Sequence, residues 1–180
     1  MKEHPILFST PMVKAILEGR KTMTRRVVKP QPENKLQGYY LNGAYAWRDP
    51  ELNLDEYPYG NYTSCPYGQV GDRLWVRETW HQDTGLAGRA IHYKADGEAY
   101  LWKPSIFMPR RFSRITLEIT NIRVERLQEI TAGDCAKEGS YMATDKDDEG
   151  GFVNLWDSIN SKTFPWSENP WVWVIEFEKV

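Results

Sequence analysis

The amino-acid sequence divides its apolar residues into many short runs, and this division constrains the fold more than any other feature. Prolines, glycines and asparagines separate the runs, and strands and helices do not alternate in the regular βαβ manner. The last run, Trp171–Lys179, is rich in β-branched and aromatic residues and predicts a long terminal strand. Many short strands with a few short helices favour an α+β domain built on a small β-barrel.

Three short helices are predicted where apolar residues recur at helical spacing. Thr10 is the expected N-cap of the first, Pro11 its first helical residue, and Gly19 its stop. A capping-box pattern at Thr131 and Asp134 opens the second, which ends at Gly139. The third carries an apolar stripe of Phe152, Leu155, Trp156 and Ile159.

Further strands are predicted where apolar and polar residues alternate, at 6–8, 22–28, 73–80, 89–95 and 115–124, the last with a local break after Ile119. We expect one domain over residues 1–180 with loop-rich insertions at about 31–70 and 81–112. The first insertion holds seven of the ten tyrosines, with a hairpin expected at Asn42-Gly43. Such aromatic residues either pack a loop onto the body or stack on bases.

Composition favours a cytoplasmic protein. No apolar run approaches the roughly 18–20 residues that span a membrane, and the first residues lack the apolar region of a signal peptide. Cys65 and Cys135 are expected to be reduced thiols. The three histidines lack metal-ligand spacing, so neither a metal site nor a cofactor is expected, and no pattern defines an oligomeric state.

Positive charge is concentrated near the start of the chain. Residues 1–30 hold seven Lys or Arg against two Glu, a net +5, whereas the whole chain carries −2 and the remainder therefore −7. A basic segment on an acidic protein favours a focused anion site. A solvated basic turn is the alternative interpretation.

The segment Gly19–Arg26 joins the first predicted helix to a strand. Strand alternation places Thr24 and Arg26 on one side and Arg25 on the other. Lys21, Thr24 and Arg26 can therefore converge, offering an ammonium, a hydroxyl and a planar guanidinium that suit a phosphate or carboxylate. An ordinary basic turn again remains the alternative.

This segment resembles the Gly-x-Lys-x-x-x-x-Arg signature of the ASCH family, matched by Gly19, Lys21 and Arg26. The run Gly71–Trp80 is similar to the "GD-x-L-x-V-x-E" element of phage-type members, which suggests a prophage-related protein. Further similarity lies in 102–109, 125–139 and 173–177. The resemblance covers nearly all of the chain outside 31–64 and 81–100.

The resemblance implies a PUA-like β-barrel with a cleft beneath the signature, in a superfamily tied to RNA binding and RNA metabolism. A bacterial branch of the family hydrolyses N4-acetylcytidine with a Lys, a Thr and a Glu. These residues correspond to Lys21, Thr24 and Glu138. Glu78 is the alternative acid; the other interpretations are a surface carboxylate for Glu138 and an ion pair with an arginine for Glu78.

The leading hypothesis is action on RNA or a modified nucleoside, most concretely hydrolysis of an N4-acylcytidine-type amide. A desolvated Lys21 would take the proton of Thr24, which would attack the acyl carbon, while Glu138 orients the lysine or transfers a proton. One alternative is a non-catalytic RNA-binding module; another is a metal-independent ribonuclease using Lys21 with Glu138 or Glu78. Nucleic-acid or anion contacts are predicted at Gly19, Arg25, Arg26, Glu78, Arg110 and Arg111.

Overall fold

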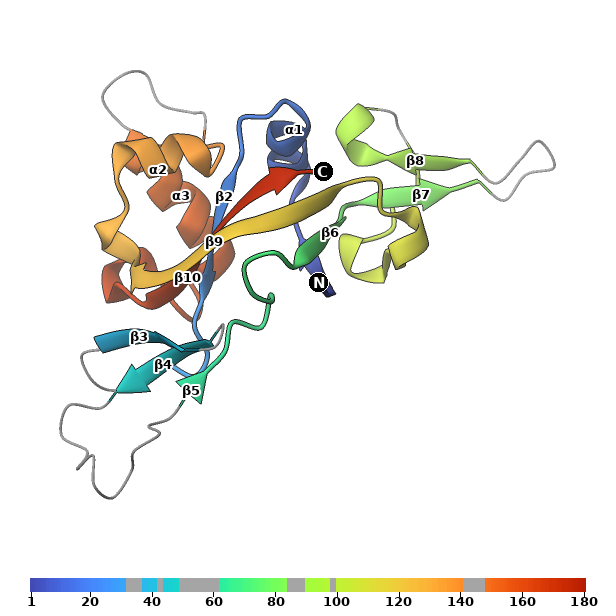
Figure 1. Cartoon of the computed structure of the whole chain (residues 1–180). Helices are drawn as coiled ribbons and strands as arrows, with labels where there is room; N and C mark the ends of the chain where they lie inside the picture. Colours follow the sequence, from blue (N-terminus) through green and yellow to red (C-terminus); the bar gives the residue numbers. More distant parts are fainter. Residues whose placement is uncertain (32–36, 42–43, 49–61, 84–89, 98–99, 141–147) are drawn as a thin grey trace.

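A five-stranded sheet forms the body of the molecule, in the order β1-β6-β9-β10-β2 (Figure 1). The computed structural model describes residues 1–31, 37–41, 44–48, 62–83, 90–97, 100–140 and 148–180. The first two strands pair in parallel and the other neighbours are antiparallel. The strands of this sheet are β1 (Glu3–Leu7), β6 (Arg73–Arg77), β9 (Thr116–Arg126), β10 (Trp171–Lys179) and β2 (Met23–Val27).

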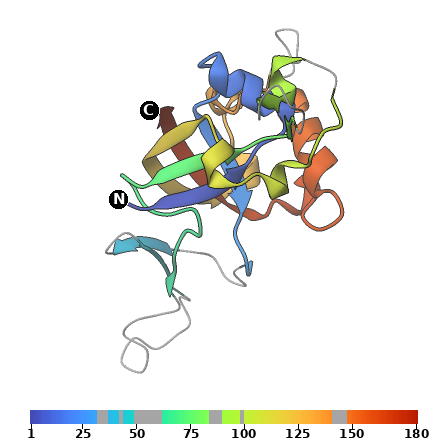
Figure 2. The same cartoon turned by 90° about the vertical axis from the view of Figure 1, so that its right-hand side faces the viewer.

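Two smaller sheets lie outside the body. One, of β3 (Gln37–Leu41), β4 (Ala44–Arg48) and β5 (Tyr62–Thr63), lies on the side of the large sheet away from α1 in both views (Figures 1 and 2). Its first two strands confirm the predicted hairpin, although the Asn42-Gly43 turn and most of the surrounding segment lie outside the described residues. The other is a hairpin of β7 (Trp80–Gln82) and β8 (Ile91–Tyr93), so the strand predicted over 73–80 divides between β6 and β7.

The three predicted helices are present as α1 (Thr10–Leu17), α2 (Ala132–Lys137) and α3 (Asp148–Asn160). The N-cap of α1 is Ser9 and not Thr10, because the helix begins one residue earlier than its proline suggests. The capping box of α2 is confirmed: the Thr131 hydroxyl accepts from the Asp134 amide at 3.1 Å. Short 3₁₀ turns complete the connections at 94–96, 105–107, 110–112, 127–129 and 166–168.

Strand β10 separates two apolar clusters because its side chains alternate between the faces of the sheet. Trp173, Ile175 and Phe177 pack in the larger cluster, which contains part of α1, whereas Val172 and Val174 pack with residues of α2 and α3. The predicted break in β9 is a shift of its pairing register with β10, between Glu176 and Phe177. This shift interrupts the two-residue alternation of buried positions along β9. No helix in the described parts of the chain combines the length and apolarity needed to cross a bilayer.

The α+β class is confirmed, but the predicted barrel is wrong because the sheet is not closed. Strands β1 and β2 are its two edges and do not pair with each other among the described residues. Arg26 of β2 stands between them instead, and its Nη2 donates to the carbonyl of Leu7, the last residue of β1, at 2.8 Å. In a closed barrel, β1 and β2 would be joined by backbone hydrogen bonds. Here the gap between them, called the seam below, contains the Arg26 side chain and a cavity.

Candidate active site

Lys21 is held at the junction of α1 and β2. Gly19 ends α1 with a φ of 74°, a conformation that suits glycine. The Lys21 amide then donates to the carbonyl of Ala15 at 3.0 Å, and the Thr22 amide donates to the carbonyl of Lys137 at 2.9 Å. These bonds fix Lys21 between the C-terminal ends of α1 and α2.

The Lys21 side chain is fully buried and its ammonium makes three hydrogen bonds. Nζ donates to the carbonyls of Met23 and Glu138, both at 2.7 Å, and to Oε2 of Glu138 at 2.8 Å. Burial lowers the pKa of Lys21 from its ordinary value, and the nearby Arg26 and Arg25 guanidinium groups act in the same direction. The Glu138 carboxylate opposes this shift of the pKa. The predicted lysine and glutamate are thus in direct contact.

Arg25 lies on the other side of Glu138, among carboxylates. Its Nη1 is 3.3 Å from Oε1 of Glu138, while Nη2 donates to Glu125 at 2.5 Å and to Asp134 at 2.9 Å. The guanidinium of Arg25 lowers the pKa of Asp134 against the opposing effect of burial. Although we predicted an anion contact for Arg25, its terminal nitrogens are therefore occupied by the protein's own carboxylates.

A cavity of about 540 Å³ lies in the open seam between β1 and β2, within the size range of small-molecule sites. The strand edges contribute Pro5, Leu7, Phe8 and residues 24–27. Helix α3 contributes a wall of Phe152, Leu155, Trp156, Ile159 and Asn160. The remaining lining comes from Ser9, Met12, Tyr67, Arg77, Thr79, Ser105 and Glu138.

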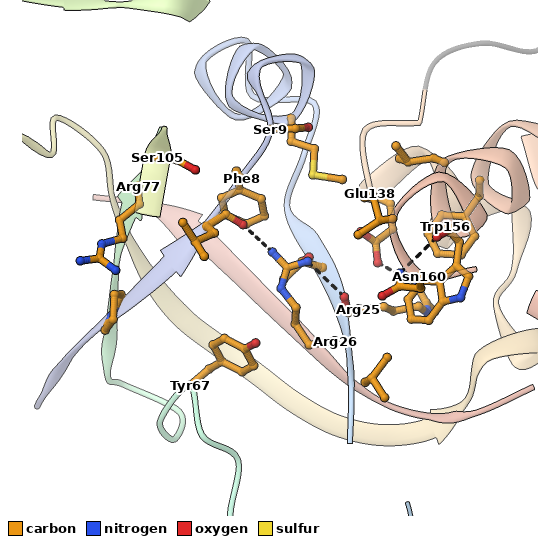
Figure 3. A pocket seen from close by; sticks show the side chains of 18 of the residues that line it. Phe8, Ser9, Arg25, Arg26, Tyr67, Arg77, Ser105, Glu138, Trp156 and Asn160 are labelled. Carbon is orange, nitrogen blue, oxygen red and sulfur yellow. Dashed lines mark hydrogen bonds and ion pairs between the residues drawn. The ribbon is translucent and has the colours of Figure 1, made fainter. Parts of the chain in front are cut away.

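Thr24 and Arg26 are both in the cavity lining, as their shared strand face predicts. Thr24 is buried, and its hydroxyl has no hydrogen-bond partner within the described part of the chain. Figure 3 shows Arg26 in the middle of the cavity, between Phe8 and Tyr67, with Glu138 and Trp156 toward α3. The Arg26 guanidinium lies 5.2 Å from the Phe8 ring centroid. Burial lowers its pKa, although an arginine keeps its charge under ordinary conditions.

Glu78 is buried away from the cavity. Its two carboxylate oxygens accept from Nε and Nη2 of Arg114 at 2.9 and 3.2 Å, which is the ion pair given above as the other interpretation. Burial raises the pKa of Glu78, while Arg114 opposes the shift. Its chain neighbours Arg77 and Thr79 line the cavity, so alternation directs Glu78 to the opposite side.

The other predicted anion-binding residues do not line the cavity. Arg110 forms a two-pronged ion pair with Glu3, with both nitrogen–oxygen distances at 2.9 Å. Arg111 lies over the ring of Phe112 at 4.7 Å and is exposed. Gly19 acts through the backbone turn that positions Lys21.

Most of the lining residues were not among the predicted site residues, and the polar or aromatic ones among them include Tyr67, Arg77, Trp156 and Asn160. Trp156 belongs to the apolar stripe that predicts α3, and the stripe alone does not distinguish a cavity wall from a core contact. Arg77 had a usable signal, because it is a charged residue on the outward face of a strand whose other face is apolar.

The sequence matches no family model and no curated protein. Two solved structures are similar in fold. An ASCH domain from Lactobacillus crispatus JV V101 has a TM-score of 0.49 and 11% identity, covering 99% of this chain and 79% of its own. A DUF984-family protein from Enterococcus faecalis V583 has a TM-score of 0.47 and 8% identity, covering 100% of this chain and 81% of its own. Neither similarity assigns a residue role to this chain.

Proposed function

We propose that this protein acts on a modified nucleoside or RNA, and that it hydrolyses an N4-acylcytidine-type amide in the seam cavity. The observation that carries the proposal is the buried contact of 2.8 Å between Nζ of Lys21 and Oε2 of Glu138. Glu138 and Thr24 both line the cavity, whereas Lys21 is not among the lining residues and contacts the cavity through Glu138. We propose that Lys21, Glu138 and Thr24 act as base, proton carrier and nucleophile.

The reaction would begin with Lys21 in its neutral form, which the desolvation of its ammonium favours. Lys21 takes the proton of the Thr24 hydroxyl, either directly or through Glu138, as the threonine oxygen bonds to the acyl carbon. The carbon–nitrogen bond then breaks and the exocyclic amine takes the proton, which leaves an acyl ester on Thr24. Water hydrolyses this ester with the same base and releases the carboxylic acid.

The cavity walls suit a nucleobase. The α3 side offers Trp156 and Leu155 as an apolar surface, and Asn160 adds an amide at the same end. An aromatic or apolar surface with a few polar groups is the usual composition of a small-ligand site. The form of the ribonuclease alternative that uses Glu78 has less support, because Glu78 is paired with Arg114 and does not line the cavity.

A non-catalytic role is the second candidate, and one observation favours it. Lys21 uses all three of its ammonium hydrogens within the protein, so as a charged group it is a structural cross-link between β2 and α2. In that case the cavity binds RNA or a nucleoside without turnover. Binding that weakens steeply with added salt, and leaves the ligand intact, supports this second function.

Mass-spectrometric turnover of N4-acetylcytidine by the wild type, Thr24→Val and Thr22→Val tests the first function. Thr24→Val keeps the side-chain shape and removes only a hydroxyl that lacks a partner among the described residues. Thr22 is exposed on the same segment and is the matched control. We expect cytidine release by the wild type and Thr22→Val, and a loss of at least about 10³-fold in Thr24→Val. Equal release by all three, or none by the wild type, contradicts hydrolysis through Thr24.

A further inference from the structure

Arg77 is a cation of the cavity whose terminal nitrogens bind no residue in the described part of the chain. Its Nε donates to the carbonyl of Met108 at 3.1 Å, whereas Nη1 and Nη2 have no hydrogen-bond or ion-pair partner among the residues that the structure describes. Arg26 differs, because it donates to the carbonyls of Leu7 and Arg25. An unused guanidinium fork in a cavity is suited to a phosphate or carboxylate.

The guanidinium of Arg77 is also held in place. Alternation puts Trp75 and Arg77 on the same face of β6, and the Arg77 Cζ lies 4.9 Å from the Trp75 ring centroid. Together with the bond to the Met108 carbonyl, this stacking fixes the side chain before a ligand arrives. Little conformational entropy is therefore lost when an anion binds.

The charges around the cavity favour an anion at this end. The described lining contains three arginines and one carboxylate, that of Glu138, which Lys21 and Arg25 already bind. Figure 3 places Arg77 and Ser105 at one end of the cavity and Glu138 and Trp156 at the other, with Arg26 between them. A ligand that fits both ends has an uncharged flat group near α3 and a negative group near Arg77.

We infer that Arg77 is a specificity-determining residue that binds the phosphate of a nucleoside phosphate, so that the preferred ligand is a nucleotide and not a free nucleoside. The inference rests on the proposed function for the base-binding end of the cavity. The phosphate is either that of a mononucleotide or that of the nucleotide linkage in RNA. Arg77 can recognise either phosphate by the same chemistry. Ligands that differ in the position of the phosphate distinguish a mononucleotide from RNA.

Equilibrium binding of cytidine, cytidine 5′-monophosphate, cytidine 3′-monophosphate and the dinucleotide CpA tests the inference by calorimetry. The proteins are the wild type, Arg77→Gln and Arg110→Gln. Arg110 is the matched control because its Cζ lies 6.0 Å from the same Trp75 ring while its nitrogens pair with Glu3. We expect at least one phosphorylated ligand to bind about tenfold or more tightly than cytidine, a gain of about 1.4 kcal/mol. Arg77→Gln should abolish this gain and Arg110→Gln should preserve it.

Each outcome decides the inference separately from the hydrolytic proposal. A preference for CpA over both mononucleotides indicates RNA as the source of the phosphate, and the reverse order indicates a mononucleotide. Equal affinity for cytidine and every phosphorylated ligand overturns the inference even if N4-acetylcytidine is hydrolysed. A gain that survives in Arg77→Gln, or no binding by any of the four ligands, overturns it as well. A gain lost in Arg77→Gln supports it even if no amide is cleaved.

Discussion

Replacing Gly139 by alanine should destabilise the protein by placing a methyl group against Lys21. Gly139 follows Glu138 with a φ of 72°, and a Cβ built there would lie 2.9 Å from the Ala15 Cβ and 3.0 Å from the Lys21 Cβ. Carbon atoms in favourable contact are about 3.5–4.0 Å apart, so the neighbours must move. The change therefore acts on the residues that hold the proposed base.

The expected loss of unfolding free energy in Gly139→Ala has two parts. A left-handed backbone costs an alanine about 1–2 kcal/mol relative to glycine. Overpacking a close contact adds about 1–3 kcal/mol, for a total of about 2–5 kcal/mol. Gly19 provides the control, because its φ is 74° and a Cβ there has no neighbour within 4 Å. Gly19→Ala should therefore show only the first part.

Urea unfolding of the wild type and both variants measures the difference. We expect the free energy of unfolding of Gly139→Ala to lie about 1–3 kcal/mol below that of Gly19→Ala, with a lower melting temperature. Equal values for the two variants, within about 0.5 kcal/mol, would refute the close packing of α2 against Lys21.

Three further predictions concern charge and thiol chemistry. Arg25→Met breaks a buried ion-pair network and should lower the free energy of urea unfolding by about 3–5 kcal/mol; Arg123→Met, at a side chain that is 30% exposed, should cost much less. The pKa of Asp134 is lowered on folding, so the contribution of its carboxylate to the free energy of unfolding is complete above the ordinary pKa of 3.8 and is lost as the pH falls through the folded pKa. The unfolding free energies of the wild type and Asp134→Asn should therefore converge in acid. Burial raises the pKa of Cys65 to about 11, so absorbance-monitored reaction with a disulfide reagent at pH 8 should run on the order of 10²-fold slower than for a free thiol.

Local patterns predicted the elements that carry the site. Alternation in β2 correctly places Thr24 and Arg26 on one strand face and Arg25 on the other, although all three line the cavity. The Thr131 capping box correctly starts the helix whose C-cap is Glu138. These features depend on residues within a few positions of one another. The same local reasoning gave the bounds of β10 as 171–179.

Features that depend on distant residues could not be predicted in the same way. Glu138 lies 113 positions from Arg25, and nothing near either residue indicates that they meet. Closure of the sheet would require pairing of β1 with β2, which are distant in sequence, and here an Arg26 side chain contacts the Leu7 carbonyl instead. The apolar stripe of α3 likewise does not show which of its residues are buried: Trp156 and Ile159 both line the cavity, but Trp156 is buried and Ile159 is 59% exposed.

The open seam has a consequence for self-association. Strand β2 is an edge strand, and an unpaired edge can add a strand from another molecule. Here the cavity occupies that edge, and α3 contributes Trp156 to its wall while Arg26 reaches across to the end of β1. The side chains that we propose to surround a ligand thus also lie where a second chain would have to add to the sheet.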